Sequence, residues 1–428
     1  MRRKIELSTL SKGLLPLSLA LSIVLSGCAS FGKGIAEAVL EKSEDKDIRV
    51  CQASGKPFEG LAPSLEKVPG KIKVLMVHGV GDHLPGYSTE FLEKLAKELK
   101  IAAKASHYKD IKLMSQQDPQ KNLGNLRISQ FKNADETKEL LFYELTWSEI
   151  TRAEKELLSF DNSGESSFRR ANVNDMLKKF SNDTGPDPIL YLGDNRENIL
   201  RAFSQSFCWM VQGGWDELPD DTRAACSIGK DFGKYFAQDN FAFVSHSLGS
   251  RITIDGLQRL ADLMSDPKSD SFLPGRARGK QLLQEKTTQI FMLSNQLPIL
   301  QLGRELPKYV GTKEDYCSAE GNHHSFRLFK KTSLVAFSDP NDILSYAIPH
   351  DFKTKYLDAR LCFTATNISI NVAKIMDLFG LGTFANPLEA HLGYDKDDRV
   401  IAMIANGLGT NHTAPLIKQK CEWTENID

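Results

Sequence analysis

The stretch 240–257 reads NFAFVSHSLGSRITIDGL and contains a short apolar run followed directly by a second segment of different periodicity. Residues 241–245 are of strand type, and residues 250–264 carry apolar side chains at helical spacing. Ser247 therefore falls on the sharp turn between a predicted strand and a predicted helix. Two residues to either side of it stand Ser245 and Gly249, which are small enough to let the strand and the helix approach closely.

A serine on such a turn is placed to act as a nucleophile. The usual pattern around this turn is G-x-S-x-G, and here Ser245 occupies the first glycine position. The alternative is an ordinary helix start, in which a serine side chain caps the first turn. Other parts of the chain are needed to choose between these two interpretations.

The composition favours a folded protein whose function resides in a local site. The 428 residues could form one large domain or two of ordinary size. A hydrophobic content of 41% supports a full core, and 25% charged residues argue against long disorder. Because 54 Lys and Arg face 55 Asp and Glu, the formal charge is −1, and we expect no nucleic-acid partner.

The first residues have the pattern of an export signal. Residues 1–4 (MRRK) are basic, residues 14–25 are apolar but short for a membrane span, and residues 25–28 read LSGC. This segment resembles a bacterial lipoprotein signal, 1–27, with its lipobox. The resemblance implies cleavage before Cys28, acylation of Cys28 and, because Ala29 follows, sorting to the outer membrane, facing the periplasm. An uncleaved amino-terminal anchor is the alternative.

The cysteines predict disulfides and no metal site. Without Cys28 six of the seven cysteines remain, an even number in a compartment that permits disulfides, and at least one bond is expected. Six cysteines allow 15 connectivities, among which the sequence does not choose. No pair has the C-x-x-C spacing of a zinc or redox site, so we predict no bound metal.

After a polar tether, residues 28–70, the chain begins its folded domain, residues 71–428. Residues 71–78 (KIKVLMVH) have a continuous apolar centre, which is typical of a buried parallel strand. Residues 78–83 (HGVGDH) follow. Glycine lets a backbone N–H turn toward a substrate oxygen, and the N–H of Val80 is the candidate donor. The alternative is a plain glycine-rich turn.

The next segments predict a helix at 88–104 and a strand at 140–147. Residues 148–238 then form a mixed helical insertion, which we expect to be a cap over the site. Its aromatic residues could line an acyl pocket or bury the core of the cap itself.

Later strands are predicted at 288–293, 333–337 and 361–371, and a closing helix at 397–406. Asp342 lies on the loop after the second of these strands, and Asp339 on the same loop is the alternative acid. His391 lies between the last strand and the closing helix, and His412 is its competitor.

Taken together, the Gly79 loop, Ser247, Asp342 and His391 stand in an order that resembles the α/β-hydrolase superfamily, specifically its lipase-like and esterase-like members, over residues 71–406. The resemblance implies an α/β fold with a mostly parallel central sheet, helices on both faces and a helical cap insertion. It implies a nucleophile, Ser247, a base, His391, and an acid, Asp342. The N–H groups of Val80 and Leu248 would form the oxyanion hole.

The implied reaction is cleavage of a carboxylic ester, of a lipid or of a small acyl compound, without a cofactor. An amidase or acyltransferase with the same three residues is an alternative. So is a non-catalytic envelope lipoprotein that uses the fold for binding, which the serine at position 245 favours.

Overall fold

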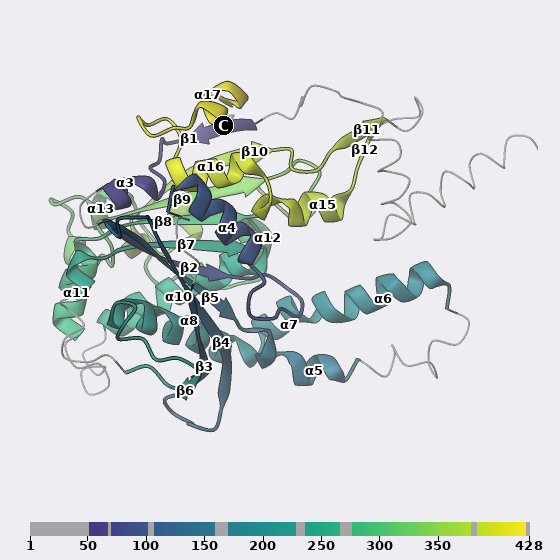
Figure 1. Ribbon diagram of the computed structural model, residues 1–428, viewed down its shortest axis with the longest axis horizontal. Coiled ribbons are helices and arrows are strands. Elements are labelled where there is room, and N and C mark those ends of the chain that lie inside the picture. Colours follow the sequence, from purple (N-terminus) through teal and green to yellow (C-terminus); the bar gives the residue numbers. More distant parts are fainter. Residues whose placement is uncertain are drawn as a thin grey trace, which may run out of the picture. The chain divides into compact units, whose positions relative to one another are not determined.

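A computed structural model describes residues 51–66, 70–101, 107–158, 170–227, 236–265, 276–377 and 383–424. Cys28, the predicted signal segment and most of the predicted tether lie outside the described residues. Figure 1 shows the arrangement of helices and strands.

Within these ranges, eleven strands form one sheet in the order β13-β1-β10-β9-β8-β7-β2-β5-β4-β3-β6. Its members are β1 (Cys51–Gly55), β2 (Gly70–Val77), β3 (His107–Met114), β4 (Asn122–Lys132), β5 (Lys138–Thr146), β6 (Thr222–Ala224), β7 (Asn240–His246), β8 (Thr287–Leu293), β9 (Lys331–Ser338), β10 (Phe363–Ile370) and β13 (Cys421–Trp423). Strands β11 (Ile375–Asp377) and β12 (Thr383–Ala385) form a separate antiparallel pair.

The α-helices differ widely in length. They are α3 (Ala62–Glu66), α4 (Thr89–Glu98), α5 (Arg152–Glu156), α6 (Asn172–Thr184), α7 (Pro186–Leu192), α8 (Asn195–Gln212), α10 (Leu248–Ser265), α11 (Arg276–Gln284), α12 (Leu297–Gln301), α13 (Lys313–Cys317), α14 (Phe352–Tyr356), α15 (Pro387–Leu392), α16 (Asp398–Asn406) and α17 (Pro415–Lys420). Short 3-10 turns are η1 (Ser148–Ile150), η4 (His324–Phe326), η5 (Ala359–Leu361) and η6 (Gly393–Asp395).

The centre of the sheet is parallel. Strands β10, β9, β8, β7, β2 and β5 pair in parallel with their neighbours, whereas β4 and β1 join antiparallel on the two sides. Strands β3, β4 and β5 lie on one side of β2, and β7 to β10 follow in chain order on the other. Successive strands are thus added on one side of β2 up to β5 and on the other side from β7 onward, so the strand order reverses between β2 and β7. In α/β proteins, ligands bind outside the carboxyl ends of the strands at such a reversal.

Both faces of the parallel strands are buried. Successive side chains of a strand point to opposite faces, and each face packs against its own group of helices. Leu75 of β2 packs into a core with α8 and α10. Its neighbours Val74 and Met76 belong to a second core with α4 and α16. Figure 1 shows these helices around the sheet. The predicted α/β class, with a mostly parallel central sheet and helices on its faces, is confirmed.

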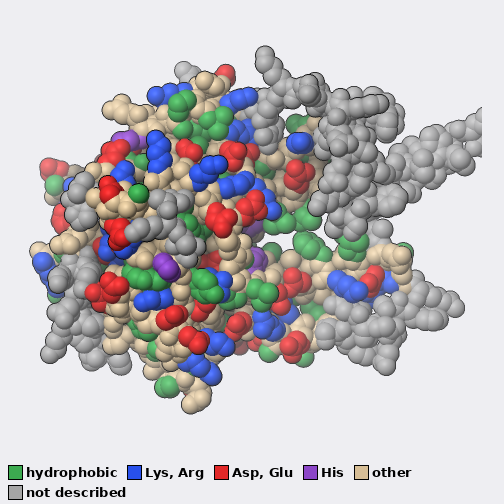
Figure 2. Space-filling view, in the orientation of Figure 1, with side chains coloured by type: hydrophobic (Ala, Val, Ile, Leu, Met, Phe, Trp, Pro, Cys, Tyr) green, Lys and Arg blue, Asp and Glu red, His purple; other side chains and the backbone are tan. Residues whose placement is uncertain are grey.

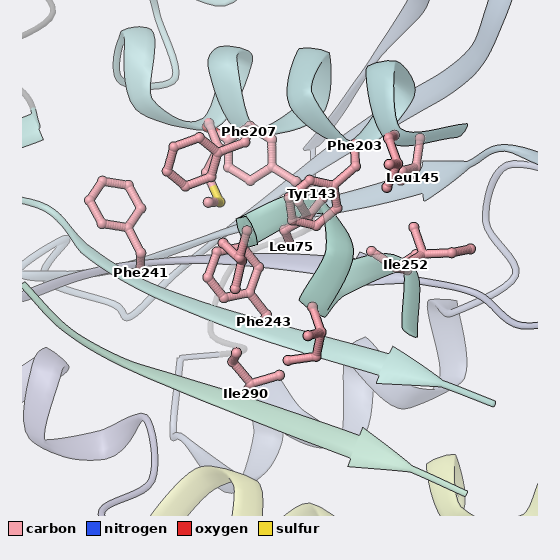
Figure 3. Close-up of a cluster of buried hydrophobic side chains, with 14 of the residues drawn as sticks. Leu75, Tyr143, Leu145, Phe203, Phe207, Phe241, Phe243, Ile252 and Ile290 are labelled. Carbon is pink, nitrogen blue, oxygen red and sulfur yellow. The ribbon is translucent and has the colours of Figure 1, made fainter. Parts of the chain in front are cut away.

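The cap expected over 148–238 stays a prediction. Of the residues described in this range, 154–158 and 170–186 fall in a smaller compact unit, and 187–227 and 236–238 belong to the large unit that holds the sheet. Phe203 and Phe207 of α8 stack on Phe243 of β7, with ring centroids 6.1 and 6.2 Å from that of Phe243. Figure 3 shows these three side chains between the helix and the strand. The aromatic residues of α8 are therefore buried in a core that they share with the main sheet, rather than in a core of their own.

One helix boundary and one pair of strands differ from the sequence-based expectation. The helix predicted to reach residue 104 ends after Glu98, and Lys100 has a left-handed φ of 58°. Residues 107–132, for which no element was predicted, form the antiparallel strands β3 and β4.

All six cysteines in the described ranges form disulfides. Cys51 pairs with Cys421, Cys208 with Cys226, and Cys317 with Cys362. The expectation of at least one disulfide is confirmed. As to membrane spans, the described part of the chain contains no helix that is both long and apolar enough to cross a bilayer.

Candidate active site

Ser247 lies on a sharp turn between β7 and α10. Its φ is +54°, in the left-handed region that side chains other than glycine adopt rarely, and its N–H donates to Leu293 O at 2.9 Å. A Cβ at Gly249 would lie 2.3 Å from Val77 O, so only glycine fits beside β2. Ser245 fits at the other small position, because it is fully buried with its Oγ 3.4 Å from Phe291 O.

The hydroxyl of Ser247 has no hydrogen-bond partner among the described residues, although it is buried. It therefore accepts no backbone N–H from the first turn of α10, and the interpretation of Ser247 as a helix cap is wrong. Ser250 satisfies the carbonyl of Ser247 instead, through its N–H at 3.0 Å and its Oγ at 2.7 Å. A buried polar group without a partner costs free energy, and such groups are found at functional sites.

His391 and Asp342 lie together. His391 is in the last turn of the short helix α15 rather than on an open loop, and Asn386 caps the N-terminus of this helix. Its Nδ1 lies 3.0 Å from Asp342 Oδ1. Burial alone would raise the pKa of Asp342, but hydrogen bonds from His391 and Ser294 and the charge of His391 lower it to about 2. Asp342 is therefore ionised at neutral pH.

Asp339, the alternative acid, serves the backbone instead. Its Oδ2 accepts hydrogen bonds from the N–H groups of Val372 and Ala373 at 2.7 and 3.0 Å, and its Oδ1 accepts from Asn341. Of the two acids, the structure brings Asp342 to His391 and uses Asp339 to hold the segment after β10.

His391 also lies beside the turn that carries Ser247. The Nε2 of His246 is 2.9 Å from His391 O, and the two imidazole rings are 5.2 Å apart. Burial lowers the pKa of His246 to about 3, so this second imidazole is neutral at physiological pH. Ser247 Oγ and the imidazole of His391 are not hydrogen-bonded to each other. Such catalytic bonds are often loose in structures without substrate.

The glycine loop after β2 lies against Ser247. A Cβ at Gly79 would be 2.7 Å from Ser247 Cβ, so the loop can approach this closely only because residue 79 is glycine. Gly81, with a φ of +91°, donates its N–H to Asp187 Oδ2 at 2.6 Å. Val80 lies on this loop next to Gly79, and Leu248 is the first residue of α10, directly after Ser247.

The other candidate histidines have separate roles. His412, the competitor of His391, bridges Glu59 and Glu66 at 3.1 Å each, and the hydrogen bond with Glu66 is the main cause of its raised pKa. His78 is buried and accepts a hydrogen bond from the N–H of Trp147 at 3.1 Å. His412 therefore pairs with two glutamates rather than with Asp342.

Sequence reasoning missed Ser294, whose Oγ contacts both Asp342 and His391. It also missed Tyr394, whose hydroxyl is 3.2 Å from Asp342 Oδ2. The available signal for Ser294 was its place directly after a predicted buried strand.

The described residues contain no cluster of three or more His, Cys, Asp or Glu that could hold a metal ion. Comparison of the chain with models of protein families, with curated proteins and with solved structures gave no match.

Proposed function

We propose that this chain is a serine hydrolase of the α/β-hydrolase type that cleaves carboxylic esters of lipids or of small acyl compounds. One observation carries the proposal. A buried serine with a left-handed φ and an unpaired hydroxyl follows the strand at the reversal point of the sheet, beside a histidine paired with an ionised aspartate.

The proposed mechanism uses a covalent acyl-enzyme. Ser247 Oγ attacks the ester carbonyl while His391 Nε2 takes its proton and then donates it to the leaving alcohol. Asp342 orients the imidazole and stabilises its charged form. The N–H groups of Val80 and Leu248 stabilise the oxyanion, and each such donor is worth roughly 2.7–4 kcal/mol. In the second half of the reaction, His391 Nε2 takes a proton from water, and the resulting hydroxide attacks the acyl carbonyl. The imidazole then returns the proton to Ser247 Oγ as the acid leaves.

An apolar acyl group is supported by exposed hydrophobic side chains. Four large ones lie in segments that follow the parallel strands along the chain. They are Leu84 after β2, Leu302 after β8, Ile343 after β9 and Leu392 after β10, which are 75%, 76%, 75% and 50% exposed. Figure 2 shows hydrophobic side chains at the surface among charged ones. Exposed apolar side chains of this size are compatible with binding of an apolar ligand.

The proposed place of action is the outer membrane, facing the periplasm. A lipid on Cys28 would hold the enzyme there, close to acyl esters. Three disulfides are compatible with an exported protein.

Covalent labelling with a fluorophosphonate tests the proposal. An isolated serine hydroxyl is unreactive, whereas one activated by an imidazole and facing an oxyanion hole reacts. Because Ser247 is only 1% exposed, the probe should be small. We expect one modified site, Ser247, with labelling abolished by Ser247→Ala and strongly reduced by His391→Ala.

His412→Ala is the matched control, because this histidine contacts Glu59 and Glu66 rather than the site. It should be labelled like the wild type. Absence of labelling at Ser247 in a correctly folded wild type would contradict the proposal and favour a binding role. For a reactive protein, a series of esters of increasing chain length and a matched amide would then define the substrate class.

A further inference from the structure

Ser294 is held rigidly between two neighbouring strands. It is the first residue after β8, is fully buried and has a φ of +52°. The carbonyl before it, Leu293 O, accepts from Ser247 N at 2.9 Å. The N–H after it, Asn295 N, donates to Phe337 O at 3.1 Å. Both flanking peptide groups are therefore fixed, and the hydroxyl of Ser294 has a defined position.

That position is between the aspartate and the histidine of the candidate site. Ser294 Oγ is 2.6 Å from Asp342 Oδ2 and 2.9 Å from His391 Nδ1. The direct contact between His391 Nδ1 and Asp342 Oδ1 is 3.0 Å. The three side chains form a closed triangle of hydrogen-bonding contacts.

The number of protons available at neutral pH determines which atom donates in each of these three contacts. Asp342, with a pKa of about 2, carries no proton and can only accept. The hydroxyl proton of Ser294 therefore goes to Asp342 Oδ2, and the Ser294 oxygen presents a lone pair to His391. A hydrogen bond at that side requires a proton on Nδ1, which leaves Nε2 unprotonated in the neutral ring.

We propose that Ser294 is a positioning residue of the reaction, which holds His391 in the tautomer with the proton on Nδ1 and supports its charged form in the transition state. The inference rests on the proposed hydrolase function. It assigns to the residue after β8 a part in catalysis through His391, without contact to the substrate.

Tyr394 provides a comparison, because its hydroxyl contacts the carboxylate of Asp342 but not the imidazole of His391. It separates an effect of Ser294 on His391 from an effect on Asp342. Its hydroxyl lies 3.2 Å from Asp342 Oδ2, the oxygen that also accepts from Ser294. It makes no hydrogen bond with His391. The Tyr394 hydroxyl also accepts the N–H of Asp339 and lies 3.3 Å from Ser345 Oγ. Removing it therefore affects Asp342 and its loop but no contact of the imidazole, whereas removing the Ser294 hydroxyl affects both Asp342 and the imidazole.

The test compares Ser294→Ala, Ser294→Gly and Tyr394→Phe in the full chain. Glycine accepts a left-handed φ without strain, so Ser294→Gly removes the hydroxyl while favouring the observed backbone. With a short acyl ester as substrate, we expect both Ser294 variants to lower kcat by about 10- to 100-fold with KM unchanged, the range for one hydrogen bond to a charged group. The fluorophosphonate labelling rate should fall in parallel, and Tyr394→Phe should have a clearly smaller effect.

Thermal unfolding confirms that each variant is folded at the assay temperature. Ser294 variants with wild-type kcat and labelling rate would overturn the inference and leave the hydrolase proposal intact. Equal losses for Tyr394→Phe and both Ser294 variants would also overturn it, because the effect would then pass through the carboxylate only. A wild type that is not labelled at Ser247 would overturn both proposals.

Discussion

Replacing Asp342 by asparagine tests the acid of the proposed catalytic site most directly. Asp342 Oδ1 faces His391 Nδ1 at 3.0 Å and accepts from Leu344 N at 3.0 Å, and its other oxygen accepts from Ser294. Asparagine has the same shape and retains one carbonyl oxygen. The substitution therefore removes the negative charge beside the imidazole while it changes the packing little.

The size of the effect follows from the geometry. When His391 takes the proton of Ser247, its ring becomes positively charged at about 3 to 4 Å from the carboxylate. At an effective dielectric constant of about 20, opposite charges at this separation attract by about 4 to 5.5 kcal/mol. Loss of that attraction in the transition state lowers kcat by about 10³- to 10⁴-fold, in line with the ~10⁴ loss for the corresponding serine-protease aspartate.

Asp339→Asn is the matched control, because it makes the same change three residues earlier in the same loop. Asp339 binds the N–H groups of Val372 and Ala373 and does not contact His391, so most activity should remain. The assay is kcat on a short acyl ester, together with the labelling rate of Ser247. A loss below about tenfold in Asp342→Asn, or a larger loss in Asp339→Asn, would refute the assignment of the acid.

The same substitution should alter the pH dependence of folding. The pKa of Asp342 is lowered in the folded state from 3.8 to about 2. Its contribution to stability is therefore fully present above about pH 4 and disappears as the pH falls through about 2; it amounts to at most about 2 kcal/mol. Urea unfolding of the wild type and Asp342→Asn between these pH values should show a difference that shrinks toward acid. A constant difference would contradict the shift.

Three further predictions concern other parts of the chain. Cys28→Ser should abolish incorporation of a radioactive fatty acid, and equal labelling of wild type and variant would remove Cys28 as the anchor. Replacing both Cys317 and Cys362 by serine opens a loop with a sequence separation of 45 residues and should lower the free energy of unfolding by about 4 kcal/mol, measured by urea denaturation; an unchanged value would argue against that bond. Gly79→Ala places a Cβ 2.7 Å from that of Ser247, so the loop must move and labelling should slow by about 100-fold; a wild-type rate would show that the loop position is irrelevant.

The parallel centre of the sheet could be predicted because its strands are buried on both faces. Such strands are continuous apolar runs, as in β2 and β7, and a single sequence reveals them. Strand β3 contains exposed and charged residues, and it becomes a strand only because it pairs with β4. Strand β1 pairs with β10 and β13, which are far away in the chain, so its local sequence does not predict a strand.

The sequence favoured Asp342 over Asp339 as the partner of His391, but it could not show what Asp339 binds instead. Asp339 and Asp342 lie on one loop, only three residues apart. Their roles separate in space, where the N–H groups of Val372 and Ala373 capture Asp339. These donors come from the segment directly after β10, and sequence spacing does not show which carboxylate they face.

The arrangement of the sheet explains why four distant residues meet. Ser247, Ser294 and Asp342 follow β7, β8 and β9, and His391 lies on the helix after β10. These four strands are adjacent and parallel, so their carboxyl ends lie at one edge, in the same order as in the chain. A slip of one residue in the pairing of β8 with β9 would turn every side chain of the shifted strand to the opposite face. The buried cores on both faces therefore fix the register, and the fixed register sets the contact of Ser294 with Asp342.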